Sequence, residues 1–129
     1  MPNLLVDKIS KEIIASKAVK MYVCNVMTQK GETEGYKASE HIGAIVEHTA
    51  PGIVDYCIVN TAKIPESMIE RYKSEGATAV VVDSEAIKKL KCKVIEAHII
   101  TIKDYVRHDA GKLAKITMDL IGSLKKAKV

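Results

Sequence analysis

The side chains most capable of chemistry lie together in one polar segment, residues 25–36, Asn-Val-Met-Thr-Gln-Lys-Gly-Glu-Thr-Glu-Gly-Tyr. Its amide and hydroxyl groups form directed hydrogen bonds, and Gly31 would let a ligand approach the backbone or present its N–H to a phosphate. Lys30 could add positive charge, whereas Glu32 and Glu34 could act as bases but are more often solvated in such a loop. The alternative is an ordinary polar connection. A loop of about ten residues is long for a compact α/β unit, which favours a function.

A second, smaller cluster occupies residues 105–109, Tyr-Val-Arg-His-Asp. The guanidinium of Arg107 could bind a phosphate through two parallel hydrogen bonds. His108 or Asp109 could instead cap the helix that follows, and capping is the favoured interpretation of these two residues.

Motifs of several enzyme and cofactor-binding classes are absent from the sequence. It contains neither glycine-rich phosphate motif, G-x-G-x-x-G or G-x-x-x-x-G-K-[ST], and neither H-E-x-x-H nor G-x-S-x-G. C-x-x-C is also missing, so a zinc cluster would lack its usual spacing. Cys24, Cys57 and Cys92 fall in or beside expected strands and are interpreted as buried thiols. His41 and His48 share a helix face but make a poor metal pair, so no catalytic or metal-ligating residue is assigned.

The order of apolar and polar residues predicts alternating helices and strands. Helices are expected at residues 3–16, 39–49, from 65 to before 76, 84–90 and 109–123, and strands at 19–25, 55–60, 77–82 and within 93–102. Residues 77–82, Ala-Thr-Ala-Val-Val-Val, lack polar alternation, as strands buried on both faces do. This alternation predicts an α/β fold with a mostly parallel sheet of about four strands and flanking helices.

Both polar clusters are expected at the carboxyl edge of this sheet. In open parallel sheets, ligands bind outside that edge, where the strand order reverses. Residues 25–36 come at the end of the first expected strand, and residues 105–109 follow the last one. The next helix is expected to begin near Ser39 as its N-cap, with Glu40 in the first turn. Its N-terminus would point toward the same edge and favour an anion there.

Composition restricts the class of protein. The chain has 129 residues, 47% of them hydrophobic, which suits one folded domain or a piece of a larger one. Its net charge of +4 is mild, and five Tyr without Phe or Trp do not make the basic, aromatic surface of single-strand nucleic-acid binders. No apolar run approaches the roughly 20 residues of a membrane span, no signal peptide is evident, and three cysteines argue against a disulfide framework. A cytoplasmic location without a nucleic-acid partner is therefore expected.

The first polar segment also carries a family resemblance. Residues 22–36, Tyr-Val-Cys-Asn-Val-Met-Thr-Gln-Lys-Gly-Glu-Thr-Glu-Gly-Tyr, followed by His41, resemble the signature of the YvcK proteins, also called gluconeogenesis factors. These belong with CofD, the 2-phospho-L-lactate transferase, in one superfamily. Residues 2–6 resemble the segment after that family's glycine-serine phosphate loop, and residues 107–109 resemble its last loop with less specificity. The resemblance covers essentially the whole chain.

This resemblance implies a Rossmann-like α/β fold and a nucleotide ligand. YvcK relatives are associated with nucleotide sugars, notably UDP-N-acetylglucosamine, and with cell shape and envelope synthesis during growth on gluconeogenic carbon sources. CofD relatives transfer a phospholactyl group to a deazaflavin, making a precursor of coenzyme F420, with Mg²⁺ at the phosphates. The motif in this chain is of the YvcK type, which favours binding and regulation over transfer.

The resemblance also implies that the chain is part of a larger domain. The family's glycine-rich first loop, aspartate-rich segment and glycine-serine loop, which would supply most phosphate and metal contacts, have no counterpart here. The chain also opens on an expected helix with no strand before it, whereas such a helix normally leaves a preceding strand. Residues 1–129 are therefore expected to form a single α/β domain, the C-terminal part of a larger CofD-like domain. No cofactor is expected in this chain, and Mg²⁺ with nucleotide would bind in a longer protein.

The predicted function is a nucleotide-sugar-binding regulatory protein, with no catalytic residue in this chain. The expected ligand contacts are Asn25, Met27, Thr28, Gln29, Gly31, Glu32, Thr33 and Arg107. A homo-oligomer would cover exposed sheet edges. Two alternatives stay open. One is a 2-phospho-L-lactate transferase, although no deazaflavin pocket or metal-binding aspartates can be placed, and the other is a non-catalytic α/β interaction domain with the polar segment as its partner surface.

Overall fold

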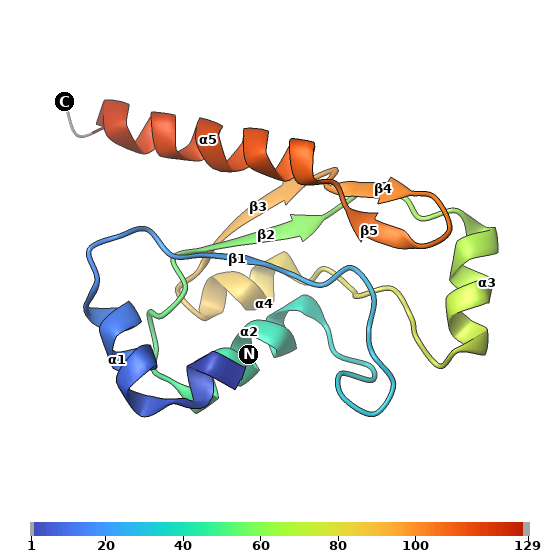
Figure 1. Cartoon of the computed structure of the whole chain (residues 1–129), viewed down its shortest axis with the longest axis horizontal. Coiled ribbons are helices and arrows are strands. Elements are labelled where there is room, and N and C mark those ends of the chain that lie inside the picture. Colours follow the sequence, from blue (N-terminus) through green and yellow to red (C-terminus); the bar gives the residue numbers. More distant parts are fainter. Residues whose placement is uncertain (1, 128–129) are drawn as a thin grey trace.

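The structure is a computed structural model that describes residues 2–127, in which a small parallel sheet lies between two layers of helices (Figure 1). The helices are η1 (Pro2–Leu5, a 3-10 turn), α1 (Asp7–Ala15), α2 (Ala38–His48), α3 (Glu66–Ser74), α4 (Ser84–Lys89) and α5 (Ala110–Ala127). The strands are β1 (Met21–Val23), β2 (Tyr56–Asn60), β3 (Lys93–Ala97), β4 (Ile100–Ile102) and β5 (Val106–His108). The main sheet has the order β1-β2-β3 and is parallel throughout, whereas β4 and β5 form a separate antiparallel pair. The expected Rossmann-like α/β arrangement is confirmed, with three strands rather than about four in the main sheet.

The central strand β2 is buried on both faces and joins two apolar cores. Successive strand residues point to opposite faces. Cys57 and Val59 belong to the core formed with η1, α1, α2 and α4, while Ile58 belongs to the core formed with α3, α5 and the β4–β5 hairpin. All three side chains are fully buried, which explains why this strand reads as an uninterrupted apolar run.

The expected strand at residues 77–82 is wrong. This segment is extended, but within the described chain its β-type pairing is a single antiparallel bridge between Ala79 and Met27. The Val80 N–H donates to the Val26 carbonyl oxygen at 2.8 Å. The segment therefore pairs with the loop that follows β1 and not with a strand of the sheet. Val80 and Val82 pack against the first core and Ala79 against the second, whereas Val81 is exposed, so this burial did not require membership of the sheet.

The expected strand within residues 93–102 is two strands. The chain turns between β3 and β4, and β4 pairs with β5 so that Thr101 lies opposite Arg107. Arg107 was expected in a loop after the last strand but lies on β5. Asp109 does cap α5 as expected, since its Oδ1 accepts the Lys112 N–H at 3.0 Å. A three-residue strand beside a tight turn leaves little periodicity in the sequence, which is why this hairpin was missed.

The helix starts differ in detail from the prediction. Lys37, not Ser39, occupies the N-cap position of α2, and the Lys37 N–H donates to the Glu40 carboxylate at 3.2 Å. Ser39 instead binds the Asp83 carboxylate through its N–H at 2.9 Å and its hydroxyl at 2.5 Å. This pair ties the first turn of α2 to the start of α4. The predicted helices at 39–49, 65–76 and 84–90 are otherwise confirmed.

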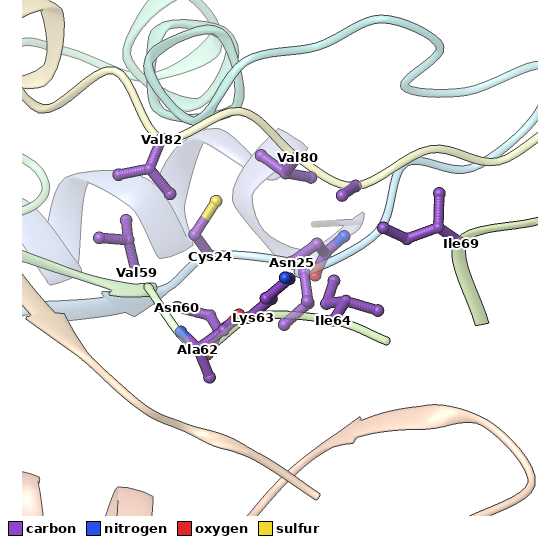
Figure 2. A pocket seen from close by; sticks show the side chains of 12 residues that line it. Cys24, Asn25, Val59, Asn60, Ala62, Lys63, Ile64, Ile69, Val80 and Val82 are labelled. Atoms are coloured by element: carbon purple, nitrogen blue, oxygen red, sulfur yellow. The ribbon is translucent and has the colours of Figure 1, made fainter. Parts of the chain in front are cut away.

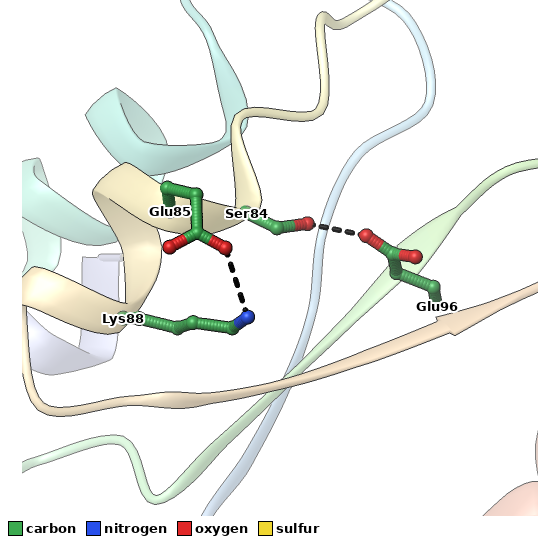
Figure 3. Close-up of polar contacts among 4 residues, drawn as sticks. All are labelled: Ser84, Glu85, Lys88 and Glu96. Atoms are coloured by element: carbon green, nitrogen blue, oxygen red, sulfur yellow. Dashed lines mark hydrogen bonds and ion pairs between the residues drawn. The ribbon is translucent and has the colours of Figure 1, made fainter.

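A second polar link joins α4 to the sheet (Figure 3). The hydroxyl of Ser84, the first residue of α4, donates to Glu96 of β3 at 2.5 Å. Glu85 and Lys88 form an exposed ion pair at 3.0 Å within the same helix. The first contact fixes the position of α4 against the edge strand, whereas an exposed pair of this kind contributes about 0–1 kcal/mol.

Candidate functional site

The polar segment leaves the carboxyl end of β1 and is shaped by its own hydrogen bonds. The Gln29 N–H donates to the Thr33 hydroxyl at 2.8 Å, and the Gln29 carbonyl oxygen accepts the Thr33 N–H at 2.9 Å. Gly31 has a φ of +78°, in the left-handed region that favours glycine. Its N–H donates to the Glu34 carboxylate at 3.0 Å. Thr33 and Glu34 therefore stabilise the turn, and the Gly31 N–H is already engaged before any ligand binds.

Thr28 anchors this segment to residues 77–80. Its side chain is only 3% exposed. The Thr28 hydroxyl accepts the Thr78 N–H at 2.9 Å and lies 3.3 Å from the Thr78 hydroxyl, while the Thr28 N–H donates to the Thr78 carbonyl oxygen at 2.8 Å. Three contacts thus join the two chain segments at one residue. The hydroxyl that the sequence suggested for a ligand is occupied by the protein itself.

We expect Thr28→Val to lower the free energy of unfolding by about 1–3 kcal/mol, because the Thr78 N–H would lose its acceptor within the protein. Valine keeps the shape of threonine and removes only the hydroxyl. Urea unfolding followed by circular dichroism would measure the loss. Thr61→Val, at an exposed position, is the matched control. Equal stability of the two variants would contradict the anchoring role.

A cleft of about 510 Å³ brings the two predicted clusters together. We call it the Arg107 cleft, and it is lined by Asn25, Val26, Met27, Thr28, Gln29, Tyr72, Val106, Arg107 and His108. The His108 Nε2 lies 3.1 Å from the Cys24 carbonyl oxygen, which holds β5 against the end of β1. The Tyr72 hydroxyl accepts the Val106 N–H at 3.0 Å, which fixes the ring beside β5. Five of the expected contact residues, including Arg107, border this cleft.

Tyr72 is the cleft residue that sequence reasoning missed. It lies on α3, far in sequence from both polar clusters. No motif or spacing marked it, because a half-buried tyrosine on an amphipathic helix is ordinary. Its place beside Arg107 depends on how α3 packs against the β4–β5 hairpin, which only the tertiary structure provides.

A second hollow, of about 540 Å³, adjoins the same polar segment. We call it the His41 pocket, and it is lined by Tyr22, Asn25, Gln29, Glu32, Thr33, Tyr36, His41, Ala44 and His48. His41 is 6% exposed, and its ring meets the edge of the Tyr36 ring at a centroid distance of 5.4 Å. The expected contacts Glu32 and Thr33 thus lie here, whereas Asn25 and Gln29 border both hollows.

A third pocket, of about 230 Å³, lies at the carboxyl ends of β1 and β2 (Figure 2). Its walls are mainly apolar, with Cys24, Val59 and Val80 among them, and Asn25 borders it too. The expectation of buried thiols is confirmed, since Cys24, Cys57 and Cys92 are all free and buried. A hydrogen bond with Cys24, together with burial, raises the pKa of Cys57, and burial raises the pKa of Cys92 to about 11. These two thiols are therefore protonated at neutral pH and unsuited to nucleophilic attack.

Burial lowers the pKa of the His41 imidazole below its ordinary value, and Glu40 partly opposes this. The unfolded chain then binds a proton more readily than the folded one, so the stabilising effect is complete above about pH 6.5 and is lost as the pH falls below that. We expect the free energy of unfolding to fall between about pH 7 and pH 5, and less steeply in His41→Gln. Urea unfolding across this range would measure it, with exposed His98→Gln as the control. An unchanged slope in His41→Gln would contradict this prediction.

Comparison with known proteins decides the family. The sequence model of the family described as 2-phospho-L-lactate transferase CofD matches residues 1–100. The chain belongs to the CofD family. It is 43% identical over 122 residues to the gluconeogenesis factor of Bacillus subtilis, and 41% identical over 120 residues to the gluconeogenesis factor of Halalkalibacterium halodurans. These matches cover 94% and 92% of this chain. The expected resemblance to gluconeogenesis factors is confirmed.

The fold of this CofD-family chain also matches a solved structure. The crystal structure of a UPF0052 family protein from Bacillus halodurans superposes with a TM-score of 0.87 and 41% sequence identity, covering 89% of this chain. The chain spans 38% of that protein and 37–38% of the two curated relatives. What those longer proteins do as wholes is therefore a proposal for this chain.

The described part of this CofD-family chain has neither a clustered set of metal ligands nor a membrane-spanning helix. Residues 2–127 contain no group of three or more His, Cys, Asp or Glu side chains placed to hold a metal ion. Over the same range, no helix has the length and apolar character needed to cross a membrane.

Proposed function

We propose that this chain binds nucleotide sugars of the UDP-N-acetylglucosamine type in the Arg107 cleft, and that it regulates rather than catalyses. The observation that supports this most is the meeting of the Asn25–Gln29 loop, Tyr72 and Arg107 in one cleft. A basic group can bind the phosphates of a nucleotide, an aromatic ring can stack on its base, and amide side chains can pair with its polar edges. The cleft also lies at the carboxyl edge of the parallel sheet, the usual ligand edge of such folds.

The chemistry of the cleft suits a nucleotide in three ways. Arg107 is exposed, and its guanidinium presents several N–H donors in a planar fork that matches phosphate oxygens. The ring of Tyr72 is held by its hydrogen bond to Val106 and borders the cleft, and we expect a base to stack on it. Asn25 and Gln29 carry both donors and acceptors and are exposed at the rim.

The same proposal includes the location of the chain, the larger domain to which it belongs and its oligomeric state. The chain would act in the cytoplasm as the C-terminal part of a larger CofD-like domain, linked to cell shape and envelope synthesis. β1 and β3 are the outer strands of the main sheet, and such edges favour pairing with another chain. A homo-oligomer would cover one of them. Sedimentation equilibrium tests this, and a monomer at all concentrations would reject the homo-oligomer.

An amide NMR titration with UDP-N-acetylglucosamine tests the binding proposal. We expect chemical-shift changes in the Asn25–Gln29 loop, at Tyr72 and in β5, because these border one cleft. Changes confined to α1 or α5 would place the ligand elsewhere. A dispersed spectrum without any change would reject binding by this chain, and binding of a protein partner under those conditions would favour an interaction domain instead.

Phospholactyl transfer is the second candidate, supported by the family match over residues 1–100. The transfer reaction would use a metal ion at the phosphates. Residues 2–127 contain no group of three or more His, Cys, Asp or Glu side chains that could hold one without the substrate. Incubation with a deazaflavin, lactyl-diphospho-guanosine and Mg²⁺, followed by chromatography of the product, tests it. Absence of product while UDP-N-acetylglucosamine binds would leave the regulatory proposal as the better one.

A further inference from the structure

The strands of the main sheet begin at the edge opposite the candidate site, and a hollow of about 410 Å³ lies there. Lys20 directly precedes β1, Tyr56 and Lys93 are the first residues of β2 and β3, and all three line it. Lys17 and Lys91 line it as well. We call it the amino-edge hollow. Within residues 2–127 it shares no lining residue with the three hollows at the carboxyl edge.

The lining of the amino-edge hollow is strongly basic. It contains Lys17, Lys20, Lys91 and Lys93, and in the described chain Asp55 is its one acidic residue. The Asp55 carboxylate already accepts the Lys20 N–H at 2.8 Å. Lys17, Lys91 and Lys93 are exposed, and with residues 2–127 none of them forms an ion pair. Unpaired charges of one sign around a concave surface raise the local concentration of the opposite ion, so this hollow attracts an anion.

The backbone of Lys91 is an independent reason to assign a role to its side chain. Among residues 2–127 it is the one residue other than glycine with a positive φ, +60°, in the left-handed region. It follows the end of α4, and its N–H donates to the Lys88 carbonyl oxygen at 3.0 Å. Glycine commonly takes this position after a helix because it lacks a Cβ. The chain thus carries a lysine where glycine would be less strained, and such strained residues concentrate at ligand sites.

An apolar groove of about 230 Å³ adjoins the amino-edge hollow, and Lys17, Val19 and Leu124 border both. Ile121 and Leu124 come from the C-terminal half of α5, which runs back toward the ends at which the strands begin (Figure 1). Within the described chain these two side chains belong to neither core. Val19 is 42% exposed. An apolar groove that opens beside a basic hollow suits a ligand that has both kinds of group.

The charge and shape of these surfaces restrict the ligand further. A phosphate monoester carries a charge of about −1.5 to −2 at pH 7, so three exposed lysines match it better than they match a singly charged carboxylate. The volume of the amino-edge hollow falls in the range of roughly 300–1,000 Å³ that is typical of small-molecule sites. Both surfaces are concave, which favours a single molecule over the flat surface of a bilayer.

We propose that the amino-edge hollow and the apolar groove form a second binding site, for a phosphate monoester of an aliphatic alcohol. The phosphate lies among the exposed lysines of the hollow, and the aliphatic chain lies along Val19, Ile121 and Leu124. The ligand is a free molecule and not part of a membrane. This site is independent of the proposed function, because none of its residues borders the Arg107 cleft.

Calorimetric titrations of the whole chain with octyl phosphate, inorganic phosphate and 1-octanol, below the concentration at which octyl phosphate forms micelles, test the two parts of the ligand. We expect octyl phosphate to bind at least tenfold more tightly than either of the others. From butyl to hexyl to octyl phosphate, the affinity should rise about two- to fourfold for each methylene group. Equal affinities for octyl phosphate and inorganic phosphate, or for octyl phosphate and 1-octanol, would overturn the proposal, as would no binding of octyl phosphate.

Lys91→Gly tests the basic part of the site without the risk that the variant fails to fold. Glycine adopts the left-handed backbone readily, so the thermal unfolding temperature should stay the same or rise. The affinity for octyl phosphate should nevertheless fall about two- to fivefold, the worth of one exposed charge contact. Lys89→Gln, which removes a charge from the exposed side of α4, is the control. Equal losses in the two variants would reduce the attraction to net charge and overturn the site.

Leu124→Ala tests the apolar part. It should weaken octyl phosphate and leave inorganic phosphate unchanged, whereas Met118→Ala, at a 64% exposed position on the same helix, should change neither. Equal effects of the two variants on octyl phosphate would contradict a chain in the groove.

Cosedimentation with vesicles distinguishes a free ligand from a lipid headgroup. Octyl phosphate binding without cosedimentation on phosphatidylglycerol vesicles supports the free ligand. Cosedimentation with these vesicles, but not with phosphatidylcholine vesicles, would make this face a membrane surface and overturn the assignment of a free ligand.

Discussion

Replacing Arg107 by glutamine is expected to weaken the binding of UDP-N-acetylglucosamine by about tenfold to hundredfold. A hydrogen bond to a charged group contributes about 1.5–3 kcal/mol, and each 1.4 kcal/mol corresponds to a factor of ten. Glutamine keeps some hydrogen-bonding capacity but loses the charge and the planar fork of donors. Isothermal titration calorimetry of the wild type and of the variant would measure the change.

The control for this prediction is Lys89→Gln, which removes the same charge from an exposed position on α4. Arg107 itself is exposed on β5, so its loss should leave the thermal unfolding temperature nearly unchanged. If Lys89→Gln weakens binding as much as Arg107→Gln does, the attraction is a general effect of net charge and the cleft is not the site. A smaller change at higher salt concentration would also fit a screened, exposed contact.

The largest expected effect on stability is that of Ile58→Ala, which should lower the free energy of unfolding by about 2–5 kcal/mol. Ile58 lies in the middle of β2, is fully buried, and packs in the core shared by α3, α5 and the β4–β5 hairpin. Truncation removes apolar contacts and leaves a cavity that the surrounding strands cannot close. Domains of this kind have total stabilities of about 5–15 kcal/mol, so the variant would keep only part of its stability.

Urea unfolding followed by circular dichroism would measure this loss. Val81→Ala is the control, since Val81 is 59% exposed and its truncation removes methyl groups that already contact solvent. We expect a change within about 0.5 kcal/mol there. Similar losses in the two variants would mean that β2 is not the centre of the fold.

Local signals predicted most of the elements. Pro65 precedes the first turn of α3, and Gly76 follows its end with a φ of +79°, so both boundaries were readable from residue type. The apolar run of β2 and the capping of α5 by Asp109 were equally local. In contrast, residues 77–82 have the composition of a strand but pair with a loop. An apolar extended segment fits any buried position, and its pairing partner depends on contacts distant in sequence.

The candidate site also has one part that the sequence predicted and another part that only the tertiary structure shows. The sequence by itself determined that residues 25–36 were the most chemically capable segment and that Arg107 was a second anion-binding candidate. It could not determine that the two meet, because a cleft between residues about eighty positions apart depends on the strand order and on the β4–β5 hairpin. Tyr72 was missed for the same reason.

Thr28 and His41 illustrate the physical basis of this division. Residue type determines that a hydroxyl or an imidazole can form a hydrogen bond, whereas the neighbouring backbone determines with what. Folding brings Thr78 to Thr28 and so uses its hydroxyl inside the protein. It buries His41 in α2, where Nε2 has no hydrogen bond with any of residues 2–127. The sequence therefore determined which groups could bind a ligand, and the tertiary structure decided which of them are still free to do so, because only the packed chain sets which donors and acceptors lie within 3 Å of each other.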